Sequence, residues 1–228
     1  MLLRKIILRL LKPLAPFFLL AALASCEPPH DVAEEPPVAV GTVAFVKIFG
    51  HHYRGEVTSV HEGYVVWSYT WKKTPVFKFK TYRGLLDVYS EEEGYKSYSK
   101  FDHNILDEFF PIEVGKETTL QGKKVSEKAG IEYPFWATIM VREKTTIKIK
   151  ETEYPVYVID FSIIEEHPDG AKNYIRTIWY SEKMETSLRT DYVIGNEIIS
   201  IRVVSLNGPD ELDDLDENEP EGLGTVRL

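Results

Sequence analysis

The chain has 228 residues, of which 43% are hydrophobic, a formal net charge of −9 and a single cysteine. This length and apolar content suffice for one domain with a sizeable core, whereas a lone cysteine excludes an internal disulfide. After the N-terminal segment the sequence holds no cluster of Lys and Arg suited to phosphates, which argues against a nucleic-acid-binding protein.

The first 25 residues have the layout of a secretory signal peptide. Four basic residues among the first twelve precede an apolar run from Leu14 to Leu23, and small residues follow. A helix that crosses a bilayer needs about twenty apolar residues, so this run of about ten is too short to be a stable membrane anchor. We therefore predict a signal peptide over residues 1–25.

The end of this segment, Leu23-Ala24-Ser25-Cys26, resembles the lipobox of bacterial lipoproteins. The resemblance implies that a lipoprotein signal peptidase recognises Leu23, Ala24 and Ser25, and that Cys26 becomes the first residue of the mature chain and carries fatty acids such as palmitate. Two or three acyl chains hold a protein stably on a membrane. An ordinary signal peptide or an incidental buried cysteine is the alternative.

Glu27 follows the cysteine, where the sorting rule of enteric bacteria retains lipoproteins with Asp in the inner membrane. This predicts an outer-membrane lipoprotein that faces the periplasm. Removal of the signal peptide takes four basic and no acidic residues, so the formal net charge falls from −9 to about −13. Residues 26–41, rich in proline and acidic side chains, are predicted to form an extended tether.

In many segments of residues 42–207, apolar and polar side chains alternate, which indicates half-buried strands. Val65, Trp67, Tyr69 and Trp71 share one predicted face of a strand. A second predicted face holds Tyr157, Ile159, Phe161 and Ile163, and in the next segment Tyr174, Ile178 and Tyr180 align. The predicted strands are 53–60, 65–71, 76–82, 85–89, 95–98, 135–142, 145–150, 157–163, 174–180, 186–193 and 198–204.

Short turns separate these strands and predict how they connect. Glycines at positions 63, 94, 170 and 195 supply the positive φ that tight hairpins need. The segment Asp102 to Glu108 has the pattern of a single helical turn. About ten strands in this order predict an all-β fold, a single antiparallel meander sheet curled into a barrel or half-barrel.

The remaining residues, 208–228, are predicted to be a disordered acidic tail. Between Asp210 and Glu221 eight of twelve residues are acidic. Asp213, Asp214 and Asp216 lack the glycine and the terminal glutamate of a calcium-binding EF-hand, so a solvated tail is the preferred interpretation.

Two internal segments carry a family resemblance. Residues 110–116 read Phe-Pro-Ile-Glu-Val-Gly-Lys, and residues 177–182 read Thr-Ile-Trp-Tyr-Ser-Glu. They resemble a turn and a later strand end of a group of uncharacterised bacterial envelope proteins. The resemblance implies a periplasmic β domain of unassigned role over residues 45–205. This sequence departs from the group at two places. Glu182 stands where the group usually has proline, and Met184 to Thr186 stand where it often has a glycine turn.

The sequence carries no common catalytic signature and predicts neither a cofactor nor a metal site. His51, His52 and His61 are the nearest to a metal constellation, but neighbours in a strand point to opposite faces, so surface histidines are the preferred interpretation. Asp160, amid apolar residues, is the acidic side chain to watch, although the alternation places it on the outward face.

Five aromatic residues could line a ligand pocket or simply fill a core: Trp67, Tyr69, Trp71, Tyr157 and Phe161. The leading hypothesis is a non-enzymatic lipoprotein whose β domain binds an envelope protein or assists envelope assembly. A carrier of a lipid or glycan is the second, and an apolar pocket above about 300 Å³ would favour it. A hydrolase, the third, needs ionisable groups that converge in a cleft.

Overall fold

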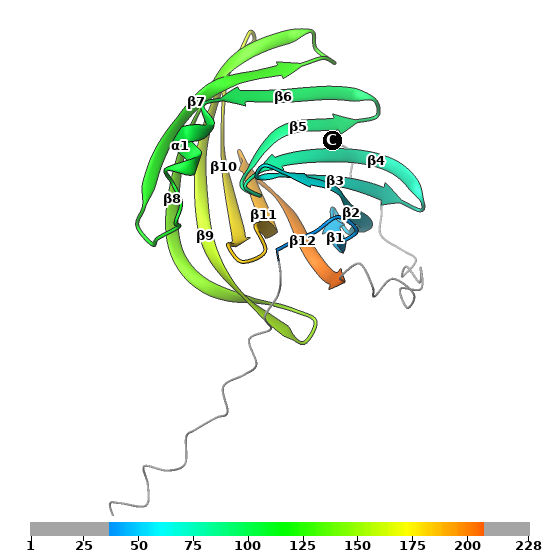
Figure 1. Cartoon of the computed structure of the whole chain (residues 1–228). Coiled ribbons are helices and arrows are strands. Elements are labelled where there is room, and N and C mark those ends of the chain that lie inside the picture. Colours follow the sequence, from blue (N-terminus) through cyan, green and yellow to red (C-terminus); the bar gives the residue numbers. More distant parts are fainter. Residues whose placement is uncertain (1–36, 208–228) are drawn as a thin grey trace, which may run out of the picture. The chain divides into compact units, whose positions relative to one another are not determined.

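A computed structural model describes residues 37–207, which form a closed antiparallel barrel of twelve strands with one short helix (Figure 1). The strands are β1 (Val43–Ile48), β2 (His51–His61), β3 (Tyr64–Trp71), β4 (Thr74–Tyr82), β5 (Leu86–Glu92), β6 (Tyr95–Phe101), β7 (Glu117–Ser126), β8 (Ile131–Ile149), β9 (Thr152–His167), β10 (Gly170–Ser181), β11 (Thr186–Ile194) and β12 (Glu197–Asn207). The helix α1 (His103–Asp107) joins β6 to β7. In the described part of the chain, no helix has the length and apolar content to span a bilayer.

Each strand pairs with its neighbours in sequence, and β1 closes the circle by pairing with β12. The prediction of an all-β antiparallel meander curled into a barrel is therefore confirmed. The predicted turn glycines 63, 94, 170 and 195 all have positive φ, as tight hairpins require. Asp102 caps α1 by accepting a hydrogen bond from the backbone N–H of Asn104, so the predicted helical turn is also confirmed.

Two strands, β1 and β7, were not predicted from the sequence, and two predicted strands form a single strand in the structure. β1 is almost wholly apolar and so shows little alternation, and β7 buries only Leu120 among polar neighbours. The predicted strands 135–142 and 145–150 are both part of β8. The charged residues in between lie at a bulge, where Arg142 has no partner opposite it on β9.

At the same bulge the buried face of β9 switches, so Val158 and Ile159 are both buried. Tyr157 shares a face with Ile159 and Phe161, as expected, because it pairs with Tyr180 in a regular β9–β10 register and packs against the first core cluster. It is half-buried, with the Lys144 ammonium 5.0 Å from its ring centre. Because a bulge bends the strand pair locally, the hairpin arm beyond it buries its opposite side.

The core consists of two clusters inside the barrel. The first lies on the inner face of β7–β10, where Ile178 and Tyr180 belong to the same face as Arg176. The helix and the loop after it pack onto this face through three buried residues: Leu106, Phe109 and Ile112. The segment between β6 and β7 therefore fills one side of the barrel.

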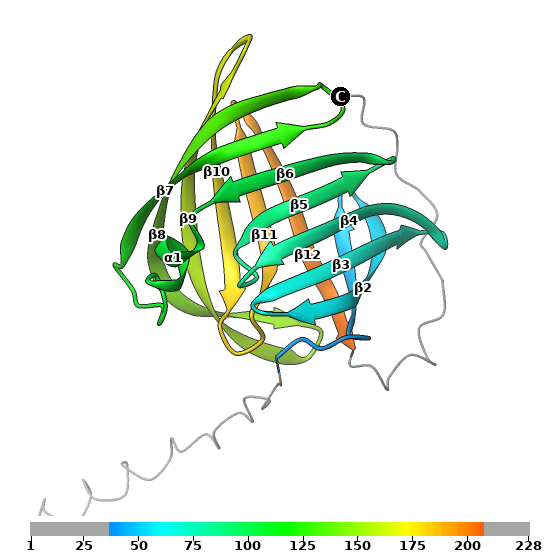
Figure 2. The same cartoon turned by 45° about the horizontal axis from the view of Figure 1, so that its top comes forward.

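The second cluster lies at the other side, around β1, β3 and β11. It includes Ile149, Tyr154 and Val156 from the end of the β8–β9 hairpin. Figures 1 and 2 show this long yellow-green hairpin curling under one end of the barrel. Beside residues of the second cluster, the inner faces of β3, β4, β11 and β12 are left only partly filled.

Shortening Leu106 tests how much the helix contributes to the core. Leu106 is fully buried, so we expect Leu106→Ala to lower the free energy of unfolding by about 2–5 kcal/mol through lost burial and a cavity. The exposed neighbour Asn104 provides the control, and Asn104→Ala should change the free energy of unfolding by less than about 0.5 kcal/mol. Urea denaturation measures both values. Equal effects would show that the helix does not pack on the core.

Candidate functional site

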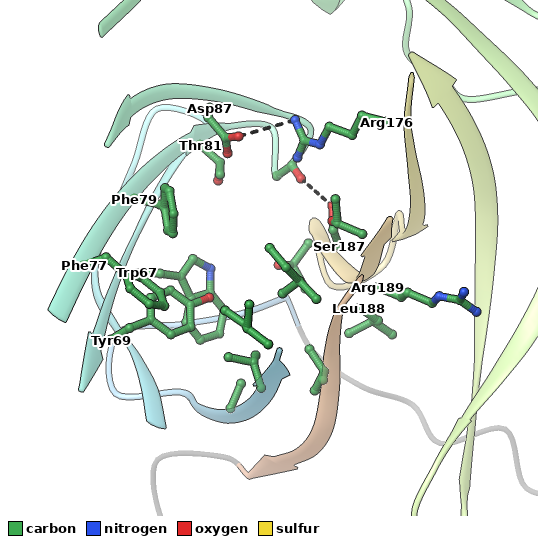
Figure 3. A pocket seen from close by; sticks show the side chains of 18 of the residues that line it. Trp67, Tyr69, Phe77, Phe79, Thr81, Asp87, Arg176, Ser187, Leu188 and Arg189 are labelled. Atoms are coloured by element: carbon green, nitrogen blue, oxygen red, sulfur yellow. Dashed lines mark hydrogen bonds and ion pairs between the residues drawn. The ribbon is translucent and has the colours of Figure 1, made fainter. Parts of the chain in front are cut away.

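The unfilled part of the barrel is a partly enclosed cavity of about 110 Å³ (Figure 3). Its walls come from β1, β3, β4, β5, β10, β11 and β12. The apolar side chains among the lining residues are Ala44, Val46, Ile48, Trp67, Tyr69, Phe77, Phe79, Leu188, Tyr192, Ile201, Val203 and Leu206. One end of the cavity is polar.

Aromatic rings from β3 and β4 form one wall of the cavity. The ring centres of Tyr69 and Phe77 lie 4.7 Å apart, and those of Phe77 and Phe79 5.4 Å apart. Tyr69 also stacks on Trp67 at 6.1 Å. Gly55 on β2 makes room for this wall, because a Cβ there would lie 2.5 Å from the Tyr69 ring. Burial raises the pKa of Tyr69, so its phenol stays neutral at ordinary pH.

The polar end is centred on Arg176 of β10, whose side chain is only 7% exposed. One of its Nη atoms lies 3.4 Å from the carboxylate of Asp87 on β5, and this carboxylate is 37% exposed. The guanidinium carbon lies 5.4 Å from the ring centre of Phe161 and 5.7 Å from that of Tyr192. Its Nε is fully buried and donates to no protein acceptor.

Hydroxyl groups surround this polar end. Ser187 Oγ donates to the carbonyl oxygen of Gly84 at 3.1 Å, and Thr81 and Thr190 also line the cavity. Gly84 has φ of +65° and packs against the backbone of Glu185, where a Cβ would lie 2.1 Å from the carbonyl oxygen. This close backbone contact holds the β4–β5 turn against the β10–β11 turn. Arg189 also contributes to the cavity lining, and Figure 3 shows its side chain extending away from the aromatic wall.

The structure places the five predicted pocket aromatics in different environments. Trp67 and Tyr69 line the cavity, as expected for a pocket wall. The other three do not. Trp71 lies at the end of β3 beside the Lys72–Lys73 turn, 37% exposed, with its ring 5.9 Å from His51. Tyr157 packs half-buried against the first core cluster, and Phe161 lies behind the Arg176 guanidinium in the same cluster.

The polar residues of the cavity were not found from the sequence. Tyr174, Ile178 and Tyr180 were aligned on one predicted face, and Arg176 belongs to that face by the same alternation. The charge of Arg176 at an inward-facing position was therefore the feature of the sequence that could have indicated a polar site. Asp87 has no such signal, because its pairing with Arg176 depends on closure of the barrel.

A second polar cluster lies on the inner faces of β7, β9 and β10. The Glu165 carboxylate accepts hydrogen bonds from Lys124 Nζ and, at 2.7 Å, from the Tyr174 hydroxyl, and it lies 2.9 Å from His167 Nε2. Burial opposes ionisation of Glu165, but Lys124 and these hydrogen bonds hold the pKa of its carboxyl below the usual value. Three protein groups contact this carboxylate, and it lines neither hollow, so the arrangement fits a structural network better than a catalytic acid.

The other singled-out residues lie apart from the cavity. Asp160 forms an ion pair with Arg142 at 3.0 Å and accepts a hydrogen bond from Thr177 at 2.6 Å. His51 is exposed beside Trp71, and His61 is exposed at the end of β2. Across residues 37–207, no three His, Cys, Asp or Glu side chains come close enough to hold a metal ion. Leu23, Ala24, Ser25 and Cys26 lie outside the described residues.

A shallow groove of about 470 Å³ crosses the outer face of β8–β11. Its apolar side chains include Trp136, Ile164, Ile175 and Val193, and its polar ones include Thr138, Ser162 and Asn173. Ile164 is 45% exposed and Ile175 is 47% exposed. Trp136 pairs with Ile164, and Ile175 pairs with Val193, so the apolar groups form neighbouring cross-strand pairs.

Comparison with known proteins identifies the fold. No protein-family model matches the chain, and no curated protein matches it. The structure resembles that of the hypothetical lipoprotein YmcC from Escherichia coli, with a TM-score of 0.51 and 10% identity over 74% of this chain and 85% of that one. At this level of identity the likeness shows a shared fold alone.

Two further solved structures superpose less well. One is an exported protein with a YmcC-like fold from Bacteroides fragilis, with a TM-score of 0.45 and 7% identity over 75% of this chain and 98% of that one. The other is a lipoprotein from Parabacteroides distasonis, with a TM-score of 0.46 and 14% identity over 75% of this chain and 97% of that one.

The Glu165 network predicts a specific loss of stability in acid. Because the carboxyl pKa is lower in the folded barrel than in the unfolded chain, the stability that it contributes is complete above about pH 5 and is lost as pH falls through the folded pKa. We expect Glu165→Gln to flatten the decline in unfolding free energy between pH 6 and pH ~3.5, measured by urea denaturation. The exposed neighbour Glu166 is the control, and Glu166→Gln should keep the decline. An unchanged slope in Glu165→Gln would contradict this account.

Proposed function

We propose that the chain is a lipid-anchored lipoprotein of the bacterial cell envelope, held on the periplasmic side of the outer membrane through Cys26. The signal-like segment, the lipobox resemblance and Glu27 support the attachment and its site. The fold shared with a hypothetical lipoprotein of E. coli agrees with this proposal. In this proposal the barrel needs no membrane-binding surface of its own.

The proposed role of the barrel is non-enzymatic binding of an envelope protein. The observation that carries it is the outer groove, where Ile164 and Ile175 are nearly half exposed beside Trp136 and Val193. Adjacent exposed apolar side chains with polar neighbours are typical of surfaces that bind proteins. The partner would insert an apolar side chain between β8 and β11 and donate hydrogen bonds to the polar rim.

The other two hypotheses have less support from the geometry. A carrier for a whole lipid or glycan needs more room than the 110 Å³ inside the barrel. A hydrolase needs ionisable groups that can reach a substrate, whereas Glu165 is already bonded to three protein groups and lies outside the lining of both hollows.

Removal of the acylated thiol tests the anchoring. We expect Cys26→Ser to abolish incorporation of labelled palmitate and to move the protein from the membrane fraction to the soluble periplasmic fraction, because no acyl chain remains. Ser25→Ala keeps a small residue before the cysteine and should remain acylated and membrane-bound. Membrane retention of the Cys26→Ser protein, with no fatty acid on the parent chain, would contradict the proposal.

A photo-crosslinking amino acid at position 175 tests the groove in cells that produce the acylated protein. We expect a discrete crosslinked protein that is absent when the same residue replaces Lys78, an exposed position on β4. Adding Ile164→Arg should remove the product, because a charge in the groove opposes burial of an apolar side chain. A product that persists with Ile164→Arg, or that forms equally from position 78, would count against a specific partner at this site.

A further inference from the structure

We propose that the cavity inside the barrel binds a small monocarboxylate with a short apolar body, and that the guanidinium of Arg176 donates hydrogen bonds to its carboxylate. This site is separate from the outer groove and goes beyond the partner-binding role. It rests on the side chains that line the cavity and on the environment of a single buried arginine.

The first step is the incomplete bonding of Arg176. A guanidinium has five N–H donors, and a buried donor without an acceptor is costly, so such groups have partners in nearly all proteins. Arg176 is 7% exposed, yet its Nε has no protein acceptor, and its closest anionic partner, Asp87, is 3.4 Å away. The guanidinium therefore has capacity for another acceptor, and it borders the cavity.

The second step is the choice of a carboxylate. The guanidinium of an arginine is planar, and neighbouring N–H donors on it match the two oxygens of a carboxylate. The rings of Phe161 and Tyr192 lie against the guanidinium and limit how it can turn. A doubly charged phosphate monoester fits less well, because Asp87 already places one negative charge beside the arginine. A monoanion would share the guanidinium with Asp87.

The third step is the apolar body. Leading away from Arg176, the cavity is lined by the aromatic wall of Tyr69, Phe77 and Phe79 and by aliphatic residues such as Leu188 and Val203 (Figure 3). A dry apolar cavity of about 150 Å³ holds a benzene molecule, so 110 Å³ limits the body to fewer than about six carbon atoms. Short-chain fatty acids have this size and charge.

Calorimetry on the whole purified chain, with hexanoate and 1-hexanol as probes, tests the proposal. The two probes share an apolar body and differ in the carboxylate. We expect hexanoate to bind at least about tenfold more tightly than hexanol, because only hexanoate offers a charged acceptor to Arg176. Arg176→Met should remove this preference by weakening hexanoate alone.

Two further variants make the result specific. Arg202→Met removes an exposed arginine of β12 that does not line the cavity, so it should leave both affinities unchanged. Val203→Phe narrows the apolar part and should weaken both probes. Circular dichroism and the thermal midpoint establish that each variant is folded.

Three outcomes would overturn the proposal. These are no detectable binding of either probe, equal binding of hexanoate and hexanol, and undiminished hexanoate binding to folded Arg176→Met. The last two outcomes would mean that water satisfies the arginine and that the cavity does not select a carboxylate. None of them bears on the groove, whose test uses crosslinking in cells.

Discussion

The pairing of β1 with β12 closes the sheet and sets the size of the space that it encloses. Closure gives every described strand two partners, so no row of backbone groups is left without a ladder. Closure of many strands also encloses a volume that has to be filled. Barrels of about eight strands are filled by their own side chains, and wider ones leave an interior that something else must occupy. With twelve strands, this barrel belongs to the wider kind.

Three parts of the chain divide that interior. The helix and its loop fill one side through Leu106, Phe109 and Ile112, and the end of the β8–β9 hairpin adds Ile149, Tyr154 and Val156 at another. The cavity is the space that remains, with an aromatic wall and a charged end. Two alternate residues of β10 carry the inner polar groups. Tyr174 takes part in the Glu165 network, and Arg176 pairs with Asp87.

Side-chain alternation allowed much of the fold to be predicted from the sequence, because a strand with one buried face shows it directly. It placed Trp67 and Tyr69 on an inward face and identified the hairpin glycines. It failed where the signal is physically absent. β7 buries little, β1 is apolar except for Lys47, and a bulge such as that at Arg142 changes which face is buried. The Arg176–Asp87 pair could not be derived, because its partners lie far apart in the chain and meet only when the circle closes.

The closing ladder has a topological consequence. Val43 lies opposite Asn207, so the first and last strands leave the barrel at the same rim. A short linker between these two positions could join the ends of the meander into a ring, and the chain could then be opened at an exposed hairpin such as Glu93–Gly94. Such a circular permutant would retain every strand pairing, including the one that now joins the two ends. The native order of the strands is thus one of several chain routes through the same closed sheet.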